Sequence, residues 1–427
     1  MRRVWRHGVV CATAMVMVSA VAAQVQAQPR LTWPEIVARF EAANPTVLAG
    51  RIGLDESRAA EITAFLRPNP QLSVSVDQLP IVGEATYPLE NLLTVASANY
   101  LHERRHKREL RRDSAQGATA VAESTQADLI RTLLFTVRGA FVQILQATAF
   151  QTFARENLTS YDQVLSLSQA RLNRGDIAQV DFDRLQLQRV QYESDVQTAL
   201  VNLRTAKIQL LRLLNDQTPV DQFEVSGAYD FRDPGQPLEA LRQTALDTRP
   251  DLAAARRAVD KAATDHRLAL ANGSVDPTFG LDVGRQQTPA TSTPPLSIWA
   301  GVSVGVPLRI FDRNQGEKLR TALEIKRSEQ LLAATRAQVI SDVDAGYATV
   351  ISTLALLRPY KATYLDQAAR VRDTITFSYQ RGGASLVDFL QSQQEYRVVQ
   401  VSYVNLVAAF LNAVNQLNLA VGQEVIP

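Results

Sequence analysis

The residues with the clearest chemical potential in this sequence are two histidines and a glutamate in the segment His102-Glu103-Arg104-Arg105-His106, which reads H-E-x-x-H. On a helix, histidines four residues apart could bind zinc while the glutamate acts as a general base. A catalytic zinc site also needs a third ligand and apolar surroundings. Instead, basic residues fill and follow the segment, namely Arg104, Arg105, Lys107, Arg108, Arg111 and Arg112. They would repel a dication, so we expect no metal site and interpret the segment as a basic collar near lipid headgroups.

Other catalytic patterns are missing from the sequence. It contains no glycine-rich phosphate loop, nucleophile elbow or carboxylate pair in a plausible context. The single cysteine is Cys11, and the three methionines are Met1, Met15 and Met17, all close to the N-terminus. Past that region the chain can form no disulfide, use no catalytic thiol and offer no soft-metal relay. We therefore expect neither an enzyme nor a cofactor.

The N-terminus is typical of a secretory signal peptide. Arg2, Arg3 and Arg6 precede an apolar run over 9–23, and Ala23 or Ala27 could be the last residue removed. A retained membrane anchor is less favoured, because the run is shorter than the roughly 20 residues that a span needs. We expect residues 1–27 to be cleaved.

The mature chain is nearly neutral. Removal of those three arginines leaves 45 − 3 = 42 basic residues against 43 acidic residues, a net charge of −1. Nothing in the overall charge therefore indicates a nucleic-acid partner. We expect no apolar stretch long enough for a transmembrane helix after the signal peptide. An exported chain of this kind would be either soluble in the periplasm or inserted in the outer membrane as a β-barrel.

The sequence contains an internal duplication with an offset of 207 residues. Matching pairs are Asn69-Pro70 with Asp276-Pro277, Arg174-Gly175 with Arg381-Gly382, and Val180-Asp181-Phe182 with Val387-Asp388-Phe389. Near the start of each copy the register slips by two, so that Asn44-Pro45 aligns with Arg249-Pro250. We predict two repeats, 28–237 and 238–427.

Each repeat predicts the same order of elements. An amphipathic helix over 33–65 or 238–270 is followed by strands with a period of two, which form a β-hairpin at about 67–103 or 275–310. Polar loops at 80–89 and 286–295 connect the two strands of each hairpin. The strands, of roughly ten residues each, have the length that crosses a bilayer when tilted.

A long helical hairpin follows the strands in each repeat. The outgoing helices are predicted over 114–173 and 316–379, the latter interrupted only by Pro359, and about 60 residues would reach about 90 Å. Each turns at a tip near 173–181 or 380–388, and a second helix returns to Asn215 or Val421. Heptad spacing predicts coiled-coil packing at Ile130, Leu134, Val137, Phe141 and Ile144; Val343, Tyr347, Val350, Leu354 and Leu357; Val196, Leu200, Leu203, Lys207, Leu210 and Leu214; and Tyr403, Val407, Phe410, Val414, Leu417 and Val421.

Four strands are too few to form a closed membrane barrel, since such barrels begin at about eight strands. An open sheet in lipid would leave backbone groups unpaired at its edges. Other copies of the chain must complete the sheet, or the strands must lie outside lipid. Three copies would supply twelve strands.

The duplicated tip pattern R-G-x-x-x-x-V-D, at 174–181 and 381–388, resembles that of the TolC family, as does Val306-Pro307-Leu308-Arg309-Ile310-Phe311-Asp312 at the end of the second hairpin. The resemblance covers essentially the whole mature chain. The first-repeat counterpart, Asn99-Tyr100-Leu101-His102-Glu103-Arg104, lacks the proline and the usual glycines. We expect a different local geometry there within the same fold.

The resemblance implies a mainly α-helical protomer of a homotrimer, with a 12-stranded outer-membrane β-barrel continued by a periplasmic α-barrel. Residues 216–237 would add to a belt around the middle. Arg174, Gly175, Arg381 and Gly382 would contact a periplasmic adaptor, which couples the duct to an inner-membrane pump of the resistance-nodulation-division type.

In that family an acidic ring narrows the periplasmic aperture. Asp181 and Asp388 match its positions, while Gln391 replaces a further acid and would weaken the cation preference. The alternative interpretation is that both aspartates only stabilise helix starts through the macrodipole.

The implied function is an exit duct that passively conducts drugs, metal ions or other small solutes out of the cell. The start of the first hairpin, Asn69-Pro70-Gln71-Leu72-Ser73-Val74, favours the heavy-metal branch of the family. The alternatives are the outer-membrane duct of a type I protein secretion system and a soluble periplasmic coiled-coil scaffold.

Overall fold

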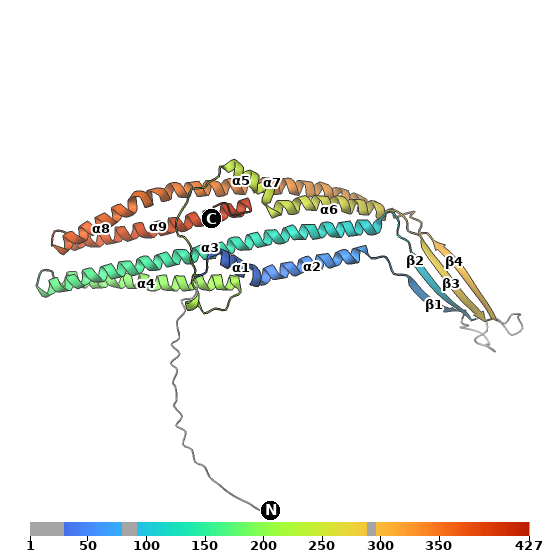
Figure 1. Ribbon diagram of the computed structural model, residues 1–427, viewed down its shortest axis with the longest axis horizontal. Coiled ribbons are helices and arrows are strands. Elements are labelled where there is room, and N and C mark those ends of the chain that lie inside the picture. The colour runs from blue at the N-terminus through green and yellow to red at the C-terminus, as the bar shows by residue number, and fades with distance from the viewer. Residues whose placement is uncertain (1–29, 79–91, 288–295, 427) are drawn as a thin grey trace, which may run out of the picture.

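The computed structural model describes residues 30–78, 92–287 and 296–426. The described chain is elongated, with a sheet at one end and the turns of two helical hairpins at the other (Figure 1). The predicted signal peptide and most of the two predicted polar loops lie outside the described residues, although Gln286 and Gln287 of the second loop belong to a strand.

Two helices, not one, open each repeat. They are α1 (Trp33–Ala43) and α2 (Pro45–Phe65) in the first, and α5 (Leu238–Thr248) and α6 (Pro250–Asn272) in the second. The prediction of continuous helices over 33–65 and 238–270 is therefore wrong. Proline disfavours the helical conformation in the residue before it and suits the first position of a new helix. Asn44 and Arg249 accordingly have extended backbones.

The sheet contains β1 (Gln71–Asp77), β2 (Leu93–Leu101), β3 (Thr278–Gln287) and β4 (Leu296–Gly305). All neighbouring strands are antiparallel and follow the order of the chain. Each repeat supplies one hairpin, as the period-two alternation predicts. The β2–β3 pairing joins the two repeats into a single curved sheet.

The long helical hairpins run side by side away from the sheet (Figure 1). In the first repeat α3 (Lys107–Asn173) turns into α4 (Gln179–Leu214), and a short 3₁₀ turn, η1 (Val220–Gln222), follows. In the second, α7 (Gln315–Pro359), a π-helical turn η2 (Tyr360–Tyr364) and α8 (Leu365–Gln380) lead to α9 (Leu386–Val421). The helix begins seven residues before the predicted start at Ser114 in the first repeat. The π-turn follows Pro359, which has no N–H to donate to the preceding turn.

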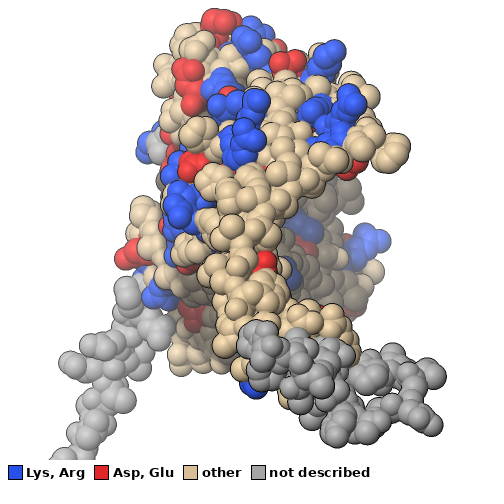
Figure 2. Space-filling view, turned by 90° about the vertical axis from the view of Figure 1, so that its right-hand side faces the viewer, with Lys and Arg blue, Asp and Glu red and all other residues tan. Residues whose placement is uncertain are grey.

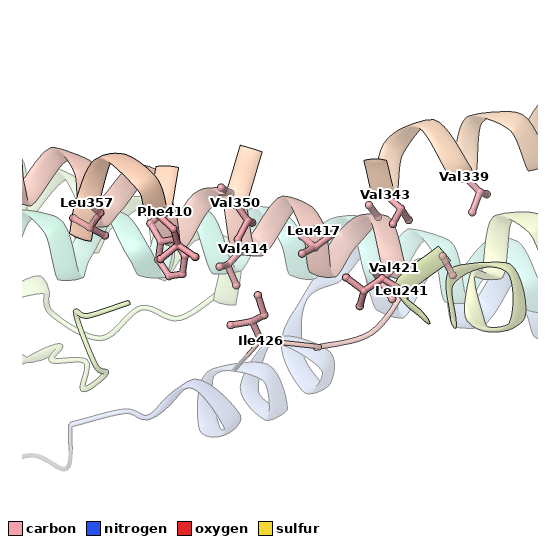
Figure 3. Close-up of a cluster of buried hydrophobic side chains, with 14 of the residues drawn as sticks. Leu241, Val339, Val343, Val350, Leu357, Phe410, Val414, Leu417, Val421 and Ile426 are labelled. Carbon is pink, nitrogen blue, oxygen red and sulfur yellow. The ribbon is translucent and has the colours of Figure 1, made fainter. Parts of the chain in front are cut away.

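The predicted heptad positions form the cores. In the second repeat Val343, Val350 and Leu357 of α7 face Phe410, Val414, Leu417 and Val421 of α9 (Figure 3). Leu241 of α5 and Ile426 near the C-terminus cover one side of this core. In the first repeat Val137, Phe141, Ile144, Leu210 and Leu214 are buried together in the same way. Each helical hairpin is thus a coiled coil with its own apolar interior.

Three helical stretches are long and apolar enough to cross a membrane by length and composition alone: Lys107–Asn173, Gln315–Gln380 and Leu386–Val421. The expectation that no such stretch follows the signal peptide is therefore wrong. The heptad positions and the alanines between them supply the apolar content. In the first two stretches only 28% of the most apolar window is buried within one protomer, so apolar helix surface remains for packing against other chains.

Candidate functional site

The four-stranded sheet has two chemically different faces. One row across the strands, Leu72–Ala98–Leu281–Val302, is apolar, and the next row, Ser73–Ser97–Asp282–Gly301, is small and polar. The large side chains of the apolar face are exposed, with 77% of Leu72, 53% of Leu281 and 86% of Val302 accessible. Exposed apolar area of this extent marks a surface that meets lipid or another protein.

Figure 2 looks at the strand end of the molecule. It shows a largely uncharged surface over the strands, while lysine and arginine residues gather over the adjoining helix ends. An uncharged band bordered by basic residues is the distribution expected of a membrane-inserted sheet and its interface.

One aromatic residue of the described strands lies on the polar face, which also carries the aliphatic Leu93 and Val95 of β2. Trp299 of β4 packs flat against Gly284 of β3, where a Cβ atom would lie 2.2 Å from Cε2 of the indole ring. A side chain at Gly284 would therefore displace the indole. Glycine is needed at position 284 because the Trp299 ring lies close to the backbone there, and not because the chain turns.

The outer edges of β1 and β4 pair with no other strand in the described part of the chain. Backbone groups that face hydrocarbon without a partner cost several kcal/mol each, roughly speaking. A single protomer is consequently an incomplete membrane structure.

The opposite end of the molecule carries the two predicted tips. Gly175 and Gly382 both have φ of +81°, a left-handed conformation that glycine adopts without strain. The N–H of Gly175 donates to the carbonyl of Leu172 at 2.9 Å, and that of Gly382 to Tyr379 at 3.1 Å. The R-G pair of the motif therefore forms the cap at the end of each outgoing helix.

Both tip arginines, Arg174 and Arg381, are exposed beside these glycines. Arg174 forms an ion pair with Asp176, with 3.1 Å between Nε and Oδ2. The guanidinium of Arg381 lies over the ring of Phe377, 4.3 Å from its centroid. The four predicted tip residues thus lie on the two turns at the end farthest from the sheet (Figure 1).

The two predicted aperture aspartates have different local roles. Asp388 forms a capping box with Ser385: the Ser385 N–H and hydroxyl donate to its carboxylate at 3.1 and 2.7 Å. In return the N–H of Asp388 donates to the Ser385 hydroxyl at 3.2 Å. These hydrogen bonds from the Ser385 side chain and backbone lower the pKa of Asp388. Asp181 follows Ala178, which offers no capping side chain.

Gln391, the third predicted aperture residue, donates from Nε2 to Oε1 of Glu395 at 2.9 Å. Glu395 is exposed on the same face of α9. It was not among the predicted aperture residues, although its i+4 spacing from Gln391 indicates that the two side chains are neighbours. The acid that Gln391 lacks is therefore present one turn further along the helix.

An aromatic cluster joins the two helical hairpins close to the tips. The ring of Tyr161 stacks on Tyr192 at 4.7 Å between centroids, and Tyr379 stacks on Phe389 at 4.9 Å. Phe389 also lies 6.2 Å from Tyr161 across the hairpins. Arg171 donates to the carbonyl of Tyr379 at 2.7 Å. Burial raises the pKa of Tyr161 and of Tyr192, so both phenols stay neutral at ordinary pH.

The connection between the two repeats, residues 216–237, crosses the helices near the middle of the molecule (Figure 1). The resemblance implies that this segment adds to a belt. Leu31 and Val225 form a parallel bridge, and the Tyr229 hydroxyl donates to the carbonyl of Val404 at 2.6 Å. Phe231 packs edge-on against Phe410. These contacts tie the connection between the repeats to α9.

The H-E-x-x-H segment does not form a zinc site in the described structure. His102, Glu103 and Arg104 precede α3, which begins at Lys107, so the histidines do not share a helical face. Glu103 is held by Arg111, with 2.8 Å between Oε2 and Nη2. Within the described residues, no three His, Cys, Asp or Glu side chains come together to hold a metal.

Comparison with known proteins fits this geometry. A model of the family described as "Outer membrane efflux protein" matches residues 241–423. The cobalt-zinc-cadmium resistance protein CzcC of Cupriavidus metallidurans is 22% identical over 371 residues, which cover 87% of this chain and 85% of that protein. The chain is thus similar to outer membrane efflux proteins in its second repeat, and to CzcC over most of its length.

Further relatives agree with this similarity. The pyoverdine export outer membrane protein OpmQ of Pseudomonas aeruginosa is 26% identical over 72% of this chain and 65% of its own length. The solved structure of CusC superposes with a TM-score of 0.75 at 15% identity, covering 93% of each chain. The outer membrane protein VceC of Vibrio cholerae gives a TM-score of 0.70 at 16% identity, over 92% of this chain and 96% of VceC.

The sequence predictions of fold, outer-membrane location and export duct are confirmed. The family that matches 241–423 consists of channel proteins rather than enzymes, and efflux channels of this kind work as trimers within tripartite pumps. A protein-secretion duct and a soluble scaffold are not favoured by these relatives.

Proposed function

We propose that this chain is one protomer of a homotrimeric exit duct for divalent metal cations, served by a periplasmic adaptor and a pump of the resistance-nodulation-division type. The observation that carries the duct is the sheet, which has one exposed apolar face, one polar face and two open edges. Three copies joined edge to edge supply twelve strands and leave no backbone edge in lipid.

The helical region supports the trimer independently. The helix α4 keeps a second set of apolar side chains on its exposed surface, at Leu187, Val190, Val201 and Ile208. Their spacing follows the heptad that already packs the other side of the helix against α3. A neighbouring protomer that covers this set would extend the coiled coils into a closed α-barrel.

The metal cargo is supported by the relative and by the distribution of acids. The name of the relative that covers 87% of this chain refers to cobalt, zinc and cadmium resistance. Asp282 lies on the polar face of the sheet. Asp181 and Asp388 lie in the first turns of α4 and α9, and Glu395 lies about two turns further along α9. Repeated three times, these carboxylates would line a path that favours cations.

We assign Asp181, Asp388 and Gln391 to the periplasmic aperture, with Glu395 supplying the acid that Gln391 lacks. Arg174, Gly175, Arg381 and Gly382 would contact the adaptor, because they form the exposed turns at the end farthest from the sheet. We assign 1–27 as the signal peptide and 28–237 and 238–427 as the two repeats.

The test is a deletion of the gene in its host, followed by growth in graded cobalt, zinc or cadmium and in unrelated antibiotics. We expect increased sensitivity to the metals, restored by the wild-type gene and only partly by D181N/D388N/E395Q. If the deletion left metal tolerance unchanged and made the cells sensitive to antibiotics, the assignment of a metal cargo would be wrong, while the assignment of an exit duct would stand. A chain that runs as a monomer in unboiled gels and in light scattering in detergent would overturn the trimer.

A further inference from the structure

A cavity of about 410 Å³ opens where the first hairpin meets α3. Its walls are Arg67, Pro68 and the continuous stretch 100–109, which includes the H-E-x-x-H segment. Four arginines, one lysine and two histidines line it, against two glutamates. The segment that failed as a metal site is therefore one wall of a strongly basic cavity.

The carboxylates at this cavity already have cationic partners. Glu103 pairs with Arg111, and Glu109 accepts from Arg108 at 3.2 Å. The buried Lys107 donates to the carbonyl of Ser274 at 2.9 Å and pairs with Asp276. Each of these three carboxylates near the cavity is therefore paired with a cationic side chain of the protein.

The electrostatics of Asp276 agree with this pairing. Burial acts to raise its pKa, but the hydrogen bonds from Lys107 and from the N–H of Arg104 outweigh burial and lower the pKa. Asp276 is therefore an anion that is fully engaged by the protein. It offers no counter-charge to the arginines on the cavity wall.

Three guanidinium groups remain at the cavity, those of Arg67, Arg104 and Arg105. All three are exposed, and none forms an ion pair with any residue in the described ranges. Guanidinium groups bind phosphate oxygens through paired N–H donors, in a geometry that ammonium groups do not provide. The cavity thus offers surplus positive charge of the type that recognises phosphate.

The cavity lies at the level of the membrane interface. Tyr100 lines it and also belongs to the last apolar row of the sheet, Tyr100–Phe279–Val304. The ring of His102 lies edge-on to Phe279, 6.3 Å away. Tyrosine at the border of an apolar band is typical of the headgroup region. A molecule with a phosphate in the cavity could therefore lay acyl chains along the apolar face.

We propose that this cavity binds the headgroup phosphate of an anionic phospholipid from the leaflet on the helical side of the outer membrane. The inference rests on membrane insertion of the strands and not on the exported cargo. At the offset of 207 residues, the positions of Arg67, Arg104 and Arg105 correspond in the second repeat to Ser274, Phe311 and Asp312, none of which carries a positive charge. The site therefore occurs once per protomer.

Native mass spectrometry of the full-length trimer in detergent, with added phosphatidylglycerol or phosphatidylcholine, tests the proposal. The variant R67Q/R104Q/R105Q removes the three guanidinium groups. The control R155Q/R212Q/R336Q removes three exposed arginines of α3, α4 and α7 that also have no ion pair in the described chain. A basic residue near an anionic surface contributes about a factor of five, so the first variant should bind phosphatidylglycerol about a hundredfold more weakly.

We expect the control to bind phosphatidylglycerol like the wild type, and phosphatidylcholine to bind weakly to all three proteins. The lysine variant R67K/R104K/R105K should retain part of the affinity, because the charge remains while the paired donors are lost. Equal binding of the two lipids, an equal loss in the control, or displacement of lipid by millimolar inorganic phosphate would overturn the proposal. Metal tolerance of cells that carry these variants is measured separately, so failure of the cargo assignment leaves the lipid result intact.

Discussion

In the first repeat Asn44 caps α2, accepting from the N–H groups of Thr46 and Val47 at 2.9 and 3.2 Å. The equivalent Arg249 of the second repeat instead forms ion pairs with Asp251 and Asp342, at 2.6 and 2.8 Å. Arg249 also donates to the carbonyl of Ala420 at 3.1 Å. The same break before proline is stabilised by a local cap in one repeat and by long-range ion pairs in the other.

The duplicated hairpins differ in their interiors as well. Lys207 of α4 is buried and reaches Glu224 of the connection between the repeats at 2.8 Å, whereas the equivalent position in α9 is the buried Val414. At the tips, Ala178 leaves Asp181 uncapped while Ser385 caps Asp388. Duplication preserved the periodicity of the helices, and the differences accumulated where side chains fix an element to its surroundings.

The largest effect should follow from removing Arg249. The variant R249M leaves two carboxylates without their buried partner and should lower the free energy of unfolding by about 4 kcal/mol. N44A removes only a cap and should cost about 1 kcal/mol. Thermal unfolding followed by circular dichroism in detergent compares the two.

The double variant R249M/D342N should recover part of the loss, because it removes one of the unpaired charges. If R249M were no more damaging than N44A, the ion pairs would contribute little. The proposed contrast between the repeats would then be wrong at this position.

A swap of the unlike core positions should give a smaller but asymmetric effect. V414K places a charge in an apolar core without a partner and should cost about 3 kcal/mol. K207V leaves Glu224 with half of its side chain in water, and we expect a change within about 1 kcal/mol. Thermal midpoints of the two variants measure the asymmetry, and equal losses would contradict it.

Exchange of the capping residues should have a smaller effect that is local to the tips. S385A should destabilise the start of α9 by about 1 kcal/mol, while A178S should stabilise the start of α4 by a similar amount or less. Hydrogen exchange of the first turn of each helix reports the change. A178S without slower exchange would mean that Asp181 cannot form the box that Asp388 forms.

The smallest effect is a dependence on pH. The pKa of Asp388 is lowered in the folded protein by its hydrogen bonds to Ser385. Its stabilising contribution is therefore complete above the ordinary carboxyl pKa of about 4, and it is lost as the pH falls through the lowered value. The difference in thermal midpoint between wild type and D388N should vanish at the acidic end of that range. A difference that grows on acidification would reverse the assigned sign.

Periodicity in the sequence predicted the strands, the coiled-coil cores and the helical tips, because each depends on spacing within one segment. The register of β4 against β3 followed the same alternation. Pro45 and Pro250 divide each of the two predicted N-terminal helices into two. That division was predictable from the local chemistry of proline.

Other features could not be predicted from the sequence, because they join residues far apart in it. Lys107 meets Asp276 across the repeats, and Phe389 lies between tyrosines from both hairpins. No short pattern encodes such pairs. The basic character of 102–112 was predicted, whereas the carboxylates that pair with Lys107 and Arg111, and the guanidinium groups that remain, became visible only in three dimensions.

The position of Trp299 against Gly284 makes this residue suitable as a fluorescent reporter. The chain has three tryptophans, Trp5, Trp33 and Trp299, and the first lies in the segment assigned as a signal peptide. In a mature W33F protein, Trp299 would be the sole indole, placed on the polar face of the sheet. Its emission spectrum and its quenching by dissolved solutes would then report, without any added dye, on access to the interior of the barrel.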